Sequence, residues 1–408
     1  MNKFRKVSIV FVLLILALSL FITGCSPSAD VSEEPQQEEA VVEEAAEAEE
    51  ADADVAEEAA DSGTMDADFD VLMDPLTEVN GPADGGKWKI GFSMSYFGNG
   101  WQTQNQNSML ALSNTPPFKD KVEVIVTQAG PDVQKQNAHL NELIAQGVDA
   151  ILLFPISPDG LNQTIQEACD QGILVMTYSA GVTAECSHNV GVDYFVQGQV
   201  MAEWLVEQLD GQGKILMNHG VAGTNAEQLR DEGAREVFDQ YEGIEIVAEI
   251  NGDWSNAVSQ EQASLALAAN PVIDGVWSEA GADGVVRAML ANEMPLVPTT
   301  GEGTNGFHRM LIDPEYQEKG LIGMTTADPG YDAGLTLKLA IAALEGYEIP
   351  KDYTQEMPTV YPGEFVECDE IAEGCTVYPQ DLVPDDWFVD MFRSDLPLTV
   401  NGFKTGKP

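Results

Sequence analysis

The sequence predicts an α/β protein of two lobes, each with a parallel sheet covered by helices. From Trp88 onward, short apolar runs rich in β-branched residues alternate with longer stretches whose apolar residues recur at helical spacing. The short runs are nearly continuous in apolar character, as expected of strands buried on both faces. They form two groups, about four before Cys186 and about four or five after Lys214. One doubly wound sheet of about nine strands is the alternative, although two lobes around a cleft fit the length better.

The alternation assigns individual elements. The expected strands are Trp88–Met94, Val122–Thr127, Ala150–Phe154, Ile173–Tyr178, Lys214–Asn218, Ile244–Glu249, Gly275–Ser278, Leu296–Thr300 and Ile322–Thr325. The expected helices are Val133–Gln146, Leu161–Gln171, Tyr194–Leu209, Thr224–Tyr241, Asn256–Ala269, Ala282–Asn292 and Tyr331–Gly346. Helix starts are indicated by Asp132, Ser157 and Asp328, of which the last two each precede a proline. Three glycines stand where helices should end, namely Gly147, Gly172 and Gly346.

The charge balance excludes several classes of partner. The 408 residues carry 19 basic and 68 acidic side chains, for a formal charge of −49. Such a chain repels nucleic acid and anionic membrane surfaces, so we expect neither as a direct partner. An acidic surface suits saline surroundings, and a lineage-wide compositional bias explains it equally well.

The first 25 residues have the pattern of an export signal. A basic start is followed by the apolar run Val7–Phe21, which is rather short for a membrane span. The run ends at Ile22-Thr23-Gly24-Cys25, which resembles the bacterial lipobox. That resemblance implies lipidation of Cys25 and attachment to a membrane through the lipid. An uncleaved signal anchor is the alternative.

Residues 26–86 form an acidic segment that we expect to be a linker. No Lys or Arg occurs between Lys6 and Lys87, and no aromatic residue of this segment precedes Phe69. Like charges repel and little apolar surface is available for burial, so an extended, disordered chain is predicted. A helix in the run rich in Ala and Glu is the alternative.

Four further cysteines favour disulfides, because their number is even and the chain is expected to be exported. Cys368 and Cys375 are close enough for local closure, and Cys169 and Cys186 could also meet. Metal binding is the alternative. It is weakened by the presence of only four His and the absence of any C-x-x-C pair.

Ligands of parallel α/β sheets bind beyond the carboxyl ends of the strands. Motifs at or near such ends are Ile90–Ser95 followed by Asn99-Gly100-Trp101, Gly220–Ala226 followed by Arg230, and Gly301–Thr304, and a further motif, Glu142–Ile151, runs from a helix into a strand. Together, in their order along the chain and with their spacing, they resemble the type I periplasmic binding proteins, in the branch of the ribose-binding protein. The resemblance extends from Trp88 to about Pro358.

This resemblance implies two Rossmann-like lobes joined by three hinge crossings, which close around a ligand. The N-terminal lobe is expected to comprise residues 87–192 and 328–357. The C-terminal lobe and tail are expected to comprise residues 193–327 and 358–408. The sequence assigns no role to the part after Pro358, which should either pack across the hinge or cover one lobe.

The resemblance also implies a ligand-binding set. Arg230 stands where the family binds sugar hydroxyls, Trp254 and Trp101 where aromatic rings cover the sugar, Asn99 near a polar partner, and Glu302 in place of an Asp. Departures from the family pattern are Ser179-Ala180 in place of Asp-Arg, Glu279 or Ala280 in place of Asn, and Ala327 beside Asp328 in place of Gln. The candidate ligand-binding residues are therefore Asn99, Trp101, Ser179, Arg230, Trp254, Glu279, Glu302 and Asp328.

The chemistry of this set suits a sugar or polyol, because aromatic rings cover C–H faces and charged groups bind hydroxyls. Because half of the polar set departs from the family pattern, we expect a polyol-like ligand other than ribose. Five of these residues also have a structural alternative: Trp101 and Trp254 as core residues, Arg230 in a surface ion pair, Glu302 as a solvated carboxylate and Asp328 as a helix cap.

These observations predict an exported, lipid-anchored monomer that delivers its ligand to the permease of an ABC transporter. Its expected place is the outer face of the cytoplasmic membrane or the periplasm. A ligand sensor for a chemoreceptor or kinase is the alternative. The sequence lacks a nucleophile–base set, a metal cluster and a dinucleotide fingerprint, so an enzyme, a metal and a cofactor are not expected.

Overall fold

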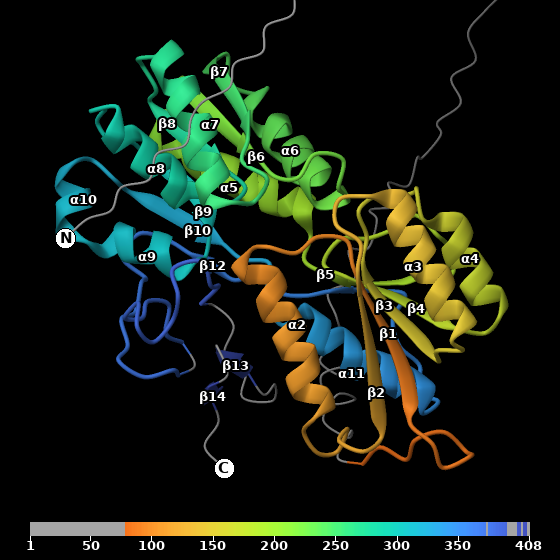
Figure 1. Cartoon of the computed structure of the whole chain (residues 1–408). Helices are drawn as coiled ribbons and strands as arrows, with labels where there is room; N and C mark the ends of the chain where they lie inside the picture. Colours follow the sequence, from red (N-terminus) through yellow and green to blue (C-terminus); the bar gives the residue numbers. More distant parts are fainter. Residues whose placement is uncertain (1–77, 373, 390–397, 401–402, 406–408) are drawn as a thin grey trace, which may run out of the picture. The chain divides into compact units, whose positions relative to one another are not determined.

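The computed structural model describes residues 78–372, 374–389, 398–400 and 403–405 (Figure 1). The predicted export signal, Cys25 and nearly all of the predicted linker lie outside these residues. Within the described part of the chain, no helix is both long and apolar enough to cross a membrane.

The first lobe is built on a six-stranded sheet in the order β11-β5-β4-β3-β1-β2. Its strands are β1 (Trp88–Met94), β2 (Val122–Gln128), β3 (Ala150–Phe154), β4 (Leu174–Tyr178), β5 (His188–Gly191) and β11 (Asp352–Thr354). Neighbouring strands pair in parallel. The lobe's helices are α2 (Gly100–Ser113), α3 (Val133–Ala145), α4 (Asn162–Asp170) and α11 (Asp332–Leu344).

The second lobe repeats this arrangement in the order β12-β10-β9-β8-β6-β7. Its strands are β6 (Gln212–His219), β7 (Gly243–Asn251), β8 (Gly275–Ser278), β9 (Thr299–Glu302), β10 (Gly323–Thr326) and β12 (Thr359–Val360). Its helices are α5 (Tyr194–Gln208), α6 (Asn225–Phe238), α7 (Asn256–Ala269), α8 (Ala282–Ala291), α9 (Asn305–Ile312) and α10 (Pro314–Glu318). The short edge strand β12 pairs antiparallel with β10. Near the C-terminus, β13 (Leu398–Val400) and β14 (Phe403–Thr405) form an antiparallel pair.

The two lobes share one topology. Taken in chain order, the first five strands of each lobe follow the doubly wound order 2-1-3-4-5. The chain passes between the two sheets three times, from β5 to β6, from β10 to β11 and from β11 to β12. The predicted α/β class, the two lobes and the three crossings are therefore confirmed.

Apolar clusters on both faces of each sheet explain why its strands are apolar throughout. In the first lobe, one cluster includes Met109 of α2 and Leu335 of α11, and the other includes Leu140 of α3 and Ile165 of α4. In the second lobe, α5 and α6 cover one face and α7, α8 and α9 cover the other.

Several predicted boundaries are wrong. The strand expected at Leu296–Thr300 is β9, three residues later, because Pro298 cannot donate a ladder hydrogen bond. Ser157 does not cap a helix: α4 begins after Leu161, and the Ser157 hydroxyl accepts a hydrogen bond from the Gly160 N–H instead. The cap predicted at Asp132 is present, and its carboxylate accepts from the Lys135 N–H.

Two disulfides are formed among the described residues. Cys169 of α4 is bonded to Cys186 just before β5, and Cys368 to Cys375 in the segment after β12. The segment after β12 was expected either to pack across the hinge or to cover one lobe, and it contacts both lobes. It contacts α9 of the second lobe through Asn305 and α2 of the first lobe through Gln104.

Candidate ligand-binding site

A small pocket lies between the two lobes at the carboxyl ends of their strands. It is lined by Asn99, Trp101, Phe154, Tyr194, Ala226, Arg230, Trp254, Glu302 and Asp328. We call this the central pocket. Its volume is about 20 Å³, which is room for about one water molecule. A sugar therefore enters only after the lobes or a lining side chain move apart.

The first lobe lines the central pocket with packed aromatic rings. The Trp101 ring centroid lies 5.4 Å from that of Phe154 and 6.2 Å from that of Tyr178. Trp101 is only 7% exposed, and its indole N–H donates to the Asp328 carbonyl at 2.8 Å. Trp101 thus belongs to the core of the first lobe and also faces the pocket. The core role and the predicted position in the binding site are therefore compatible.

The second lobe contributes Trp254, which the backbone holds in an uncommon conformation. Asp253 and Trp254 have φ values of 51° and 52°, in the left-handed region that non-glycine residues seldom adopt. The indole N–H donates to Glu279 Oε2 at 3.1 Å. A Cβ on Gly220 would lie 1.9 Å from the indole nitrogen, so only glycine leaves room for the ring. The Trp254 ring centroid lies 6.4 Å from that of Phe154 in the opposite lobe.

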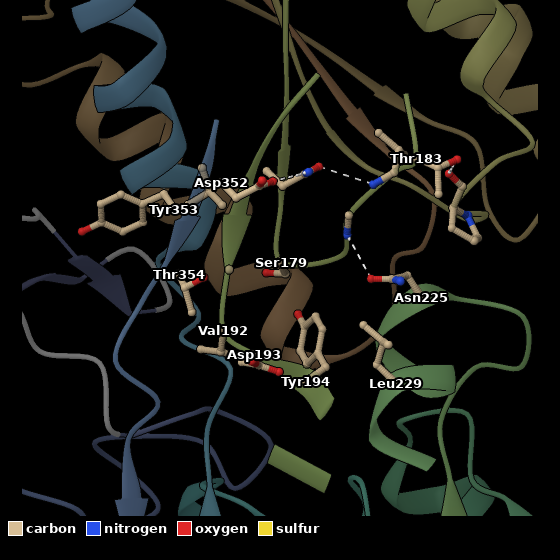
Figure 2. A pocket seen from close by; sticks show the side chains of 16 residues that line it. Ser179, Thr183, Val192, Asp193, Tyr194, Asn225, Leu229, Asp352, Tyr353 and Thr354 are labelled. Carbon is tan, nitrogen blue, oxygen red and sulfur yellow. Dashed lines mark hydrogen bonds between the residues drawn. The ribbon is translucent and has the colours of Figure 1, made fainter. Parts of the chain in front are cut away.

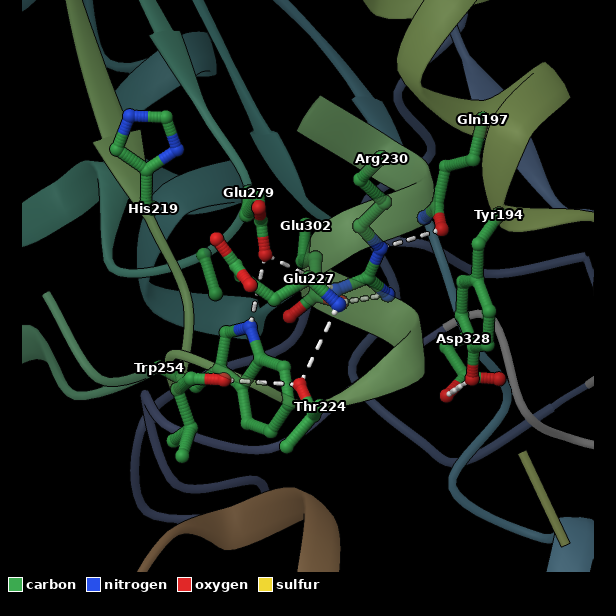
Figure 3. A network of polar contacts seen from close by, with 12 residues as sticks. Tyr194, Gln197, His219, Thr224, Glu227, Arg230, Trp254, Glu279, Glu302 and Asp328 are labelled. Carbon is green, nitrogen blue, oxygen red and sulfur yellow. Dashed lines mark hydrogen bonds and ion pairs between the residues drawn. The ribbon is translucent and has the colours of Figure 1, made fainter. Parts of the chain in front are cut away.

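Arg230 is the charged centre of the pocket. It lies on α6, which begins after Thr224, whose hydroxyl accepts from the Glu227 N–H. The guanidinium is 3% exposed. It donates to Gln197 Oε1 at 2.8 Å and to Glu302 Oε1 at 2.9 Å. Figure 3 shows these groups gathered around it, with Glu279 and Trp254 to one side and Tyr194 with Asp328 to the other.

Buried carboxyl groups outnumber this one guanidinium. Burial raises the pKa of Glu302 to about 7, although the neighbouring Arg230 charge opposes the rise. Burial likewise raises the pKa of Glu279 well above its ordinary value, again against Arg230, whose Nη1 lies 3.8 Å from Glu279 Oε2. These carboxyl groups accordingly take up protons more readily than exposed ones do.

A second pair of carboxyl groups joins the pocket to the hinge. Asp328 Oδ2 accepts from the Tyr194 hydroxyl at 2.7 Å, and Asp332 Oδ2 accepts from the Ser179 hydroxyl at 2.7 Å. Burial raises the pKa of both carboxyl groups, and the Asp328 charge raises that of Asp332 further.

The structure brings six of the eight predicted residues together around the central pocket: Asn99, Trp101, Arg230, Trp254, Glu302 and Asp328. Glu279 instead lies behind Trp254, fully buried. Ser179 lines a neighbouring cavity of about 300 Å³, shown in Figure 2, between the β4–β5 region and the start of α6. Its hydroxyl is bound to Asp332, and Asp332 was not predicted to take part.

Three structural alternatives are wrong. Asp328 is not a helix cap, because the N-cap position of α11 is Tyr331. Arg230 is not in a surface ion pair, and Glu302 is not solvated, because the two form one buried pair. Sequence reasoning missed Phe154, Tyr194 and Ala226. Phe154 ends a predicted strand, and that position indicates a place near the ligand. Tyr194 and Ala226 belong to expected helices, and nothing in the sequence around them indicates a binding role.

The described residues contain one group with the spacing of metal ligands: atoms of His219, Glu227 and Glu279 lie within 4.8 Å of one another. His219 also lies 3.1 Å from Glu249 and 3.4 Å from Asp231. His219 Nε2 and Glu279 Oε2 each have a protein partner, whereas His219 Nδ1 and Glu279 Oε1 have no hydrogen-bond partner among the described residues, and we assign no metal here.

Comparisons with known proteins agree with this geometry. A family model described as a periplasmic binding protein domain matches residues 90–348. The xylitol-binding protein of Mycolicibacterium smegmatis is 24% identical over 243 residues, which cover 59% of this chain and 69% of that protein. The ribose import binding protein of Bacillus subtilis is 25% identical over 161 residues, which cover 39% of this chain and 52% of that protein.

Solved structures show the same fold. An ABC transporter solute-binding protein of Bacillus halodurans with bound myo-inositol has a TM-score of 0.62 at 22% identity, covering 69% of this chain and 96% of that one. The fructose-binding periplasmic domain of a hybrid two-component system has a TM-score of 0.60 at 19% identity, covering 67% and 90%. The chain belongs to the periplasmic binding protein family, in its type I, ribose-binding-like branch, whose members bind solutes and are not enzymes.

Proposed function

We propose that the protein captures a sugar or polyol in the central pocket and presents it to the permease of an ABC transporter. One observation carries this proposal: a buried guanidinium, Arg230, lies beside two indole rings exactly where the lobes meet. Indole faces cover the C–H surfaces of a sugar, and charged groups bind its hydroxyls. The xylitol-binding and ribose-binding relatives support the same ligand class.

Capture requires the lobes to open and close. Few hydrogen bonds between the two lobe bodies oppose opening, and two of them are long. The Tyr96 hydroxyl donates to the Asp253 carbonyl at 3.4 Å, and the Gly181 N–H donates to Asn225 Oδ1 at 3.4 Å. A ligand that bonds Arg230 and Glu302 of the second lobe and packs on Trp101 of the first stabilises the closed form, because it contacts both lobes at once.

Thermal-shift and calorimetric titrations test the proposal directly. Xylitol, ribose and myo-inositol are titrated into the protein, and amino acids serve as negative controls. Arg230→Ala should abolish the response to the polyol that binds, and Trp254→Ala should weaken it by at least about tenfold. Arg235→Ala is a matched control on the same helix, because Arg235 pairs with Asp231 and Glu249 outside the pocket. An unaltered response in both pocket variants contradicts the assignment of this site.

The membrane anchor is a separate part of the proposal. The lipobox pattern at Cys25 supports lipidation, and the acidic linker would let the two lobes reach away from the membrane. Metabolic labelling with a radioactive fatty acid tests this. Wild type should be labelled and fractionate with membranes, and Cys25→Ser should be unlabelled and released. Equal labelling of the two proteins contradicts it.

Sensing is the second candidate function. The same fold serves as the fructose-binding domain of a hybrid two-component system. Ligand-dependent crosslinking to a permease supports transport, and ligand-dependent crosslinking to a sensor kinase or chemoreceptor supports sensing.

A further inference from the structure

The chain continues well beyond the region that matches the family, which ends at residue 348. We call residues 361–372 and 374–389 the C-terminal segment. It folds on a small apolar cluster that includes Tyr378, Trp387 and Val389, beside the Cys368–Cys375 disulfide. It is therefore an ordered addition to the family domain.

The C-terminal segment is bound to the second lobe through the start of α9. The Asn305 side chain accepts from the Tyr378 N–H at 2.9 Å and donates to the Val383 carbonyl at 2.7 Å. The Asn305 N–H donates to the Trp387 carbonyl at 2.8 Å. The Val389 N–H donates to the Gly303 carbonyl, next to Glu302 of the central pocket. These bonds fix the segment beside the pocket.

The same segment is also bound to the first lobe, through α2. The Gln104 side chain donates to the Phe388 carbonyl at 3.1 Å and accepts from the Phe388 N–H at 3.0 Å. A Cβ on Gly100 would lie 2.0 Å from the Asp386 carbonyl oxygen, so glycine is required for this approach. Phe388 is 4% exposed. The segment thus forms a wall that spans both lobes at one end of the cleft.

A cavity of about 170 Å³ lies between this wall and the central pocket. Trp254, Asn99, Trp101 and Glu302 line both spaces, so the two are adjacent. The wall contributes Asp386 and Phe388, and α7 contributes Ala257. The volume is several times that of the central pocket.

The lining of this cavity fits a hydroxyl-rich group. Glu302 and Asp386 accept hydrogen bonds, and the starts of α2 and α7 present N–H groups that have no partner within their helices. Trp254 and Phe388 offer apolar faces for C–H groups. The two carboxylates disfavour an anionic substituent such as a phosphate.

We propose that this cavity is a second ligand subsite, which takes a sugar ring or polyol substituent joined to the ring held in the central pocket. The preferred ligand is then a neutral glycoside with two units, and the C-terminal segment sets the ligand size. This inference rests on the proposed function, because it assumes that the central pocket binds the first unit.

Paired ligands test the inference by calorimetry on the wild-type domain. We compare myo-inositol with its galactoside, xylose with xylobiose, and glucose with maltose. At least one two-unit ligand should bind at least tenfold more tightly than its one-unit counterpart. One-unit ligands that bind as tightly as every two-unit ligand overturn the inference and leave the proposed function intact. Binding of neither class overturns the proposed function itself.

A substitution that fills the cavity gives an independent test. Ala257 is exposed at the start of α7 and lines the cavity without lining the central pocket. Ala257→Trp should raise the Kd of the two-unit ligand at least tenfold and change that of the one-unit ligand less than twofold. Leu265→Trp is the control, because Leu265 is 66% exposed on the same helix. Equal effects of Ala257→Trp on both ligands, or no effect on either, overturn the inference.

Discussion

The two walls of the central pocket come from lobes of one topology and yet differ in chemistry. The first lobe offers Trp101 and Phe154, stacked onto its own core. The second lobe offers Arg230 and Glu302, a buried ion pair. Where the family pattern has an Asp-Arg pair at the end of the fourth strand, this chain has Ser179-Ala180. The first lobe therefore supplies apolar contact, whereas the second supplies the charged pair together with the Trp254 ring, and the fold alone fixes neither role.

The largest expected effect concerns the charged wall. Arg230→Ala leaves Glu302 and Glu279 buried without their cation, which should lower the free energy of unfolding by about 3–5 kcal/mol at pH 8. Urea denaturation measures this loss. Arg235→Ala, on the surface of the same helix, should cost less than about 1 kcal/mol. A loss below about 1 kcal/mol for Arg230→Ala would show that the second wall does not depend on its charge pair.

The pH dependence of stability sharpens the same comparison. Burial raises the pKa of Glu302 to about 7, so between about pH 4.5 and pH 7 the folded protein holds a proton that the unfolded chain has lost. Glu302 therefore makes the free energy of unfolding fall as pH rises through this window, by at most about 3 kcal/mol.

The control for this effect is Glu302→Gln, which should remove that fall. The buried His308, whose pKa burial lowers to about 4, acts in the opposite direction over an overlapping range, from its ordinary pKa of 6.5 down to about pH 4. Because both proteins contain His308, the difference between their stability curves isolates Glu302. Parallel curves from pH 4.5 to pH 8 would contradict the raised pKa.

The two indole rings of the central pocket should differ in what their removal costs. Trp254→Ala removes a ring that faces the ligand, and should raise the Kd of the bound polyol by about tenfold to a hundredfold, or about 1.4–2.8 kcal/mol. Trp101→Ala should act first on stability, because Trp101 is a member of the core cluster. Calorimetric titration and thermal unfolding of the two variants separate these effects. Equal losses of stability would show that the two indoles play one role.

The smallest expected effect concerns the bonds between the lobes. Gln104→Ala removes two hydrogen bonds to Phe388 and should weaken closure by about 1–3 kcal/mol. Ligand dissociation should become faster, and the radius of gyration without ligand should rise in small-angle scattering. Gln106→Ala on the same helix is the control. An unchanged dissociation rate in Gln104→Ala would mean that the C-terminal segment does not hold the lobes together.

Local patterns explain which predictions hold and which fail. Asp132 caps α3 as predicted, because a cap depends on the three residues that follow it. Asp328 and Ser157 look like caps in sequence, but tertiary contacts or a local turn engage their oxygens instead. Glu279 was placed in the pocket by its position after β8, whereas its side chain turns behind Trp254. Position along a strand predicts which edge a residue reaches, and packing decides where its side chain points.

The sequence by itself determined the α/β class, the two groups of strands and most of the residues around the pocket. Those features follow from spacing along the chain and from short motifs at strand ends. Only the tertiary structure decided that Trp101 is both a core residue and a lining residue of the pocket, and that Ser179 binds Asp332. It also decided that the C-terminal segment forms a wall at one end of the cleft. Gln104 and Phe388 are 284 positions apart, and contacts of that kind arise from packing, which local sequence patterns do not encode.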